Sequence, residues 1–158
     1  LPALIRFHEI QAGDVFLLED QIRVQTLSGE HPGGSILYRL EEATQGSEPA
    51  SIVYGLDCEL TDAMFQKLKE FAGACGLLIC DACYTEAELL LRQGWGHGSI
   101  ERCRKLRQAS GAQQALFMHY ERSYQDTFLR EQEKISLAQD PACLFAREGM
   151  ALKVHGQG

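Results

Sequence analysis

Polar side chains with metal-binding chemistry follow several short apolar runs in this sequence. Asp57, Asp81 and His119 each come just after such a run, and His31 lies in a turn-rich stretch that follows another. His97 lies in a glycine-rich loop. Loops beyond the strand ends of an α/β sheet are where ligands gather. Imidazoles and carboxylates bind zinc, manganese or iron, and one carboxylate can bridge two ions. These residue types indicate part of a two-metal hydrolytic site.

Each of these residues also has a simpler explanation. A histidine in a loop, such as His31 or His97, is usually only solvated. An aspartate after a strand often forms a turn or caps a helix, and Asp57 and Asp81 each precede a predicted helix. Spacing alone therefore does not establish a site.

The elements that must position these residues are strands in the first half of the chain and alternating helices and strands in the second. We expect strands at 15–18, 22–27, 36–40, 51–54, 77–80 and 115–118, a polar hairpin loop at 41–50, and a closing hairpin at 144–146 and 150–154. Thr61, Thr85 and Ser99 can each cap a helix, and a fourth helix is expected from about 123 to 139. This order predicts the α/β class, with one sheet covered by helices.

Composition limits the classes of function. The chain has 158 residues, of which 45% are hydrophobic and 23% charged, so we expect one globular domain. Its net charge of −7 argues against a broad footprint on nucleic acid, which needs clustered Lys and Arg. No apolar run approaches the roughly 18 residues of a membrane span.

The six cysteines lie in or beside apolar runs and on a predicted helix face. This setting favours a reduced, cytoplasmic protein over a disulfide framework. Cys80 and Cys83 have the CxxC spacing, but a lone pair cannot complete a four-ligand zinc site. A redox role for this pair remains an alternative.

Five short sequence motifs occur in order along the chain. They are His31-Pro-Gly-Gly-Ser-Ile-Leu-Tyr-Arg, Gly55-Leu-Asp-Cys-Glu, Asp81-Ala-Cys-Tyr-Thr, Trp95-Gly-His-Gly-Ser, and the end of a predicted strand at His119. Together they resemble the metallo-β-lactamase fold superfamily, specifically its phosphodiesterase-like members related to ribonuclease Z. The five motifs and the elements between them span about residues 24–126. The loop departs from the family's Gly-His-Ser-Thr pattern, and Tyr-Glu-Arg follows His119 where relatives often carry a second His or a Ser-Pro word.

The resemblance implies the C-terminal part of an αββα sandwich. The family's main metal motif, His-x-His-x-Asp-His, is absent from the sequence. Residues 1–158 are therefore expected to form the C-terminal portion of such a domain, without its N-terminal portion. A start at Leu1 instead of Met agrees with this expectation.

The resemblance also implies a function, which is hydrolysis of a small phosphodiester by a metal-bound hydroxide. A cyclic nucleotide is one candidate substrate, and a large structured RNA is disfavoured by the charge. The implied cofactors are two divalent ions, zinc first, with manganese or iron as alternatives. By resemblance, His31, Asp57 and His119 are the metal ligands and Asp57 bridges the ions. His97 would act on the substrate, and Asp81 would orient His97.

Two alternatives remain open at this stage. The chain could be a catalytically incomplete half-domain that needs a missing N-terminal half, or a non-catalytic binding or redox module. Loss of half of a two-layer domain would expose an apolar face. We therefore expect either a homo-oligomer or a separate N-terminal partner segment, and no membrane partner.

Overall fold

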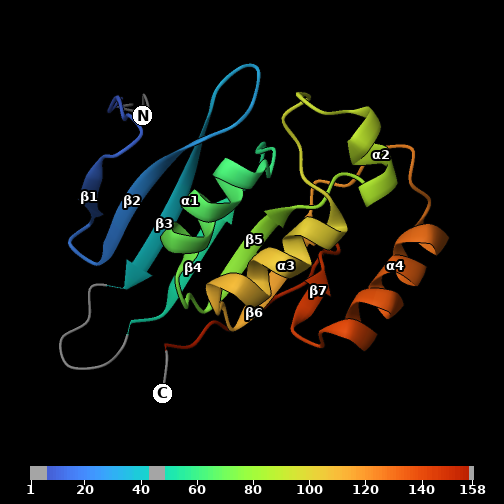
Figure 1. The fold of residues 1–158 in the computed structure, drawn as a ribbon. Helices are drawn as coiled ribbons and strands as arrows, with labels where there is room; N and C mark the ends of the chain where they lie inside the picture. The colour runs from blue at the N-terminus through green and yellow to red at the C-terminus, as the bar shows by residue number, and fades with distance from the viewer. Residues whose placement is uncertain (1–6, 43–48, 157–158) are drawn as a thin grey trace, which may run out of the picture.

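The computed structural model describes residues 7–42 and 49–156 (Figure 1). Seven strands form one sheet whose spatial order is the order of the sequence. The strands are β1 (Val15–Leu18), β2 (Ile22–Gly29), β3 (Ser35–Glu42), β4 (Ser51–Gly55), β5 (Leu77–Asp81), β6 (Gln114–Met118) and β7 (Cys143–Phe145). The helices are α1 (Asp62–Ala72), α2 (Glu86–Leu91), α3 (Ile100–Ser110) and α4 (Asp126–Gln139).

The sheet changes from antiparallel to parallel at β4. Strands β1 to β4 pair antiparallel, whereas β4 to β7 pair parallel. Parallel neighbours need a long crossover, and here each crossover contains at least one helix. The carboxyl ends of β4, β5 and β6 therefore meet at one edge of the sheet.

The predicted helix caps are present. The Thr61 hydroxyl accepts from the backbone N–H of Met64, and the Ser99 hydroxyl accepts from that of Arg102. Thr85 forms a capping box with Glu88 at the start of α2. These hydroxyls fill the N-cap positions, so Asp57 and Asp81 are not required as caps.

The main core lies between one face of the sheet and the helices α1 and α3, which cross that face in Figure 1. Alternate strand residues point into this core because side chains alternate across a pleated strand. Its buried residues include Leu37, Val53, Leu78, Cys80, Ala115, Phe117 and Phe145 from the strands, and Met64, Leu68, Cys103 and Leu106 from the helices.

The opposite face of the sheet carries apolar side chains that stay partly exposed. The strand register aligns them in one row across five strands: Tyr38, Tyr54, Ile79, Leu116 and Leu144. Tyr54 is 40% exposed, and the other four are intermediate. This sheet face is therefore an apolar surface that stays partly open to solvent.

The predicted closing hairpin is wrong. Residues 143–145 form β7, but β7 pairs parallel with β6, and residues 150–154 form no strand. Helix α4 follows β6 in the sequence and precedes β7. It carries the chain back to the edge of the sheet at which β6 begins, so β7 runs in the same direction as β6. The last helix begins at Asp126, three residues after its predicted start. Most of the predicted hairpin loop at 41–50 falls on residues 43–48, outside the described residues.

Within the described ranges, no helix combines the length and the hydrophobicity that a bilayer crossing requires.

Candidate metal centre

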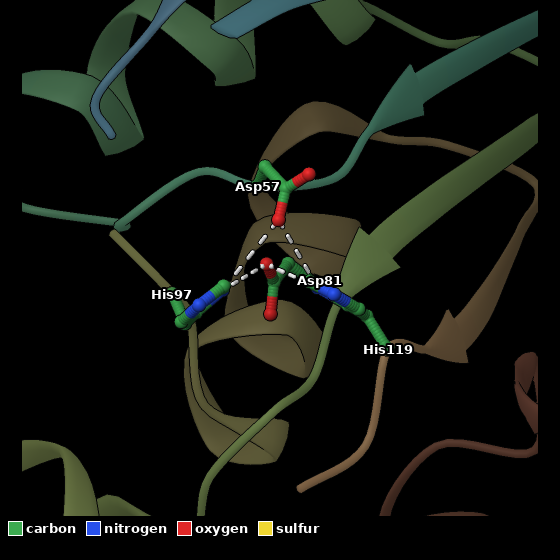
Figure 2. A group of neighbouring side chains, drawn as sticks. All are labelled: Asp57, Asp81, His97 and His119. Carbon is green, nitrogen blue, oxygen red and sulfur yellow. Dashed lines mark hydrogen bonds and ion pairs between the residues drawn. The ribbon is translucent and has the colours of Figure 1, made fainter. Parts of the chain in front are cut away.

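Three of the predicted site residues meet at the carboxyl edge of the parallel strands. The register pairs Gly55 with Cys80, and Asp81 with Met118. Because the three strands end at the same level, the residues that follow them converge there. Figure 2 shows Asp57, Asp81 and His119 with their side chains directed toward one another.

The fourth residue, His97, reaches the same place from the loop between α2 and α3. A short bridge between Tyr84 and Ser99 ties this loop to the segment after β5. The Tyr84 N–H donates to the Gly98 carbonyl at 3.1 Å. A Cβ on Gly98 would lie 2.4 Å from the Asp81 carbonyl oxygen, so glycine is required for this approach.

Asp81 is the shared acceptor of the group. Its Oδ2 lies 2.9 Å from His97 Nδ1 and 3.0 Å from His119 Nδ1, and the residue is 1% exposed. Its Oδ1 accepts from the Cys83 N–H at 3.2 Å. Oδ1 of the more exposed Asp57 lies 3.6 Å from His119 Nδ1 and 3.9 Å from His97 Nδ1. One ligand atom from each of the four residues falls within 4.8 Å of the others.

Two of the four residues hold a strained backbone. Asp57 has a φ of 50° and His119 a φ of 64°, both in the left-handed region that non-glycine residues seldom adopt. Such conformations cost about 1–3 kcal/mol each and cluster at functional sites. The two residues turn the chain sharply just beyond β4 and β6, which points both side chains into the group.

The donor set suits a divalent cation. Two imidazoles and two carboxylates are ligands for zinc, manganese and iron. The hydrogen bond to Asp81 raises the pKa of His119, with a smaller contribution from Asp57. An imidazole must be neutral to bind a cation, so protons compete with metal at His119.

The structure does not separate the residues predicted as metal ligands from those predicted as catalytic. His97 and Asp81, predicted as catalytic, lie in one donor group with the predicted ligands Asp57 and His119. His31, the third predicted ligand, lies beside this group, its ring centroid 5.6 Å from that of His97. Its Nδ1 accepts from the Gly33 N–H at 3.2 Å, which places the proton of a neutral ring on Nε2.

The cysteines of the CxxC pair lie in different environments. Cys80 belongs to the main core, whereas Cys83 packs in a small cluster with Tyr84 and Leu89. All six cysteines are buried free thiols. Burial raises the pKa of Cys83 to about 12, which leaves little of the reactive thiolate near neutral pH.

Comparison of the structure with solved proteins identifies the fold. It is similar to the metallo-β-lactamase fold protein YhfI from Bacillus subtilis, at 18% identity and a TM-score of 0.65 over 89% of this chain and 53% of that one. It is also similar to human tRNase Z, short form, at 13% identity and a TM-score of 0.61, over 89% and 46% of the two chains. A diphosphatase of the PhnP family matches at 13% identity and a TM-score of 0.55, over 95% and 50%. The chain has a metallo-β-lactamase-type fold, and the resemblance predicted from the sequence is confirmed at this level.

The chain spans about half the length of these solved proteins. No protein-family model and no curated protein matches the sequence. The likeness therefore defines the fold, and the chemistry must be argued from the site itself.

Proposed function

We propose that this chain provides half of the metal centre of a metal-dependent hydrolase that acts on a small phosphodiester. The observation that carries the proposal is the group of Asp57, Asp81, His97 and His119 at the carboxyl edge of the parallel strands. Support comes from the fold, which is shared with a tRNase and a diphosphatase.

In this proposal Asp57 and His119 hold the metal, with His31 as a third ligand and two ions, zinc first, as the expected complement. His31 must then release its hydrogen bond with Gly33 or move its proton. A bound divalent cation would supply Lewis acidity and lower the pKa of a water molecule. Asp57, as the more exposed carboxylate of the group, is the residue suited to bridge two ions.

The protein side chains divide the remaining work. Because Asp81 accepts from Nδ1 of both His97 and His119, it orients both rings and leaves each Nε2 free. Nε2 of His119 can then bind a cation. Nε2 of protonated His97 can donate a hydrogen bond to a phosphate oxygen or a proton to the leaving oxygen.

Charge supports a small substrate. The chain has 22 acidic and 15 basic residues, so it lacks the excess of Lys and Arg that holds a long phosphate backbone. A cyclic nucleotide satisfies this condition. The buried free thiols agree with the predicted reducing, cytoplasmic location.

The second candidate is a half-domain that binds metal but needs another segment for catalysis. The partly exposed row of apolar side chains on the sheet favours it, because such a face is normally covered. In that case the second half, on the same or another polypeptide, is the partner.

The test is to measure zinc binding by calorimetry, and hydrolysis of bis(p-nitrophenyl) phosphate and cyclic AMP, for this chain and for the polypeptide that its gene encodes. We expect Asp57→Ala to abolish stoichiometric zinc binding. His97→Ala should keep the metal and reduce turnover by about 10²–10⁴-fold. If both proteins bind zinc but neither hydrolyses these substrates, the hydrolase proposal fails and the chain is a metal-binding module. Unchanged zinc stoichiometry in Asp57→Ala would refute the assigned site.

A further inference from the structure

Glu59 is a buried carboxylate outside the predicted set of site residues. It is 9% exposed and lies two residues after Asp57, in the segment between β4 and α1. Its carboxylate accepts from the Gly94 N–H, at 2.7 Å to Oε2 and 3.0 Å to Oε1. Oε2 also accepts from the Gly96 N–H at 3.1 Å. A buried carboxylate is costly unless such donors compensate it, so the two loop amides stabilise Glu59 in its buried position.

The two amides bracket Trp95, immediately before His97. The Trp95 side chain is 59% exposed, so the largest apolar group of the loop does not anchor it in the core. Gly94 and Gly96 have φ values of 81° and 90°, and glycine is the residue with the most backbone freedom. The Glu59 carboxylate therefore restrains the 94–96 part of the loop, while the Tyr84–Ser99 bridge ties down its other end.

The same residue is tied to the other side of the site. The Glu59 N–H donates to the Glu30 carbonyl at 2.8 Å, next to His31. Glu59 thus connects the segment that carries Asp57, the turn that carries His31 and the loop that carries His97. A displacement of about 1 Å between reacting groups can cost on the order of 10²-fold in rate.

We propose that Glu59 is a positioning residue that holds the 94–98 loop so that His97 faces Asp57 and Asp81. The inference rests on the proposed function for its catalytic consequence. The restraint itself is a property of the chain and can be measured without metal or substrate.

The experiment compares Glu59→Ala, Glu59→Gln and the control Glu88→Gln. Glu88 is a part-buried acid that caps α2, and its carboxylate is hydrogen-bonded to Thr85 and Tyr124 instead of to the amides of the 94–98 loop. In Glu59→Ala we expect the amides of Gly94 and Gly96 to exchange about tenfold faster or more, because each loses a charge-assisted hydrogen bond. The NMR signal of the His97 ring should also move. Glu59→Gln keeps one acceptor oxygen and should show a smaller effect, and Glu88→Gln should change neither readout.

Turnover of the metal-loaded protein gives the second readout. We expect Glu59→Ala to lower kcat by about 10²-fold with zinc stoichiometry unchanged, and to add no loss in a His97→Ala background. Equal losses in both backgrounds, or an unmoved His97 signal, would overturn the proposal. If the wild type neither binds zinc nor hydrolyses phosphodiesters, the proposed function fails. Glu59 is then judged on the amide exchange and the ring signal alone.

Discussion

At the residue scale, the central feature of the site is that one carboxylate oxygen serves two imidazoles. Asp81 Oδ2 lies within 3.0 Å of Nδ1 in both His97 and His119, and water has almost no access to it. A buried carboxylate needs such partners, and each ring gains a defined orientation. The arrangement explains why the structure does not separate predicted ligands from predicted catalytic residues: Asp81 holds one of each.

The first prediction concerns the pH dependence of stability without metal. The hydrogen bond to Asp81 raises the pKa of His119 above its usual value of about 6.5. A raised pKa in the folded state means that the protonated ring stabilises the fold. This contribution is fully present below about pH 6.5 and is lost as the pH rises through the raised value.

Urea unfolding in the presence of a chelator at pH 5.5 and pH 8 measures this contribution. We expect the free-energy difference between wild type and His119→Gln to be larger at pH 5.5 than at pH 8. A difference that is independent of pH would show that the His119–Asp81 hydrogen bond does not favour the charged ring.

At the element scale, the glycine loop between α2 and α3 has two positions with similar backbone strain and different surroundings. Gly94 and Gly96 both have positive φ, but a Cβ on Gly94 would meet nothing within 4 Å. A Cβ on Gly96 would lie 2.3 Å from His31 Cδ2 and 2.7 Å from Pro32 Cδ. The loop therefore packs against the turn that carries His31 only because residue 96 has no side chain.

The second prediction compares alanine at these two positions. Both variants should lose about 1–2 kcal/mol from the left-handed backbone. Gly96→Ala should lose more and should shift the NMR signals of the His31 ring, because His31 and Pro32 must move. Thermal unfolding and NMR measure both effects. Equal stability of the two variants, with an unmoved His31, would contradict the close packing.

At the scale of the whole molecule, the sheet is covered unequally on its two faces. Helices α1 and α3 bury one face, while the row of Tyr38, Tyr54, Ile79, Leu116 and Leu144 stays partly exposed on the other. Water-exposed apolar surface drives association. The expected self-association or second-half partner is a prediction about this face.

The third prediction is that charge on this face reduces association. Tyr54→Lys combined with Leu116→Lys should lower hydrophobic-dye binding and shift sedimentation of the chain toward the monomer. The control is Leu91→Lys, on α2 and 84% exposed. If the double variant and the control behave alike, the sheet face is not the associating surface.

The fourth prediction concerns the thiols. Burial raises the pKa of Cys58 and Cys75 to about 11, and that of Cys83 and Cys143 to about 12. The native protein at pH 8 should therefore react with a disulfide reagent far more slowly than the urea-unfolded protein, which should release all six equivalents. Rapid modification of Cys80 or Cys83 in the native protein would instead support the redox alternative.

Local patterns in the sequence were sufficient for most elements. Apolar runs marked the strands, and Thr61, Thr85 and Ser99 marked helix starts, because caps and side-chain periodicity act over a few residues. The short sequence motifs identified the fold, and they contain all four residues of the candidate metal centre. The failure at the terminal hairpin has a non-local cause, since α4 carries β7 to a parallel position beside β6.

The tertiary structure decided what depends on contacts between distant segments. Residues 57, 81, 97 and 119 become neighbours only because three parallel strands end at one level and the Tyr84–Ser99 bridge brings the loop beside them. Glu59 acquires a role only through amides 35 and 37 residues away. The sequence by itself determined which chemistry was available, because that depends on residue types. Which atoms share a hydrogen bond, and which could bind the same metal ion, depends on the register of the strands and the packing of the loops.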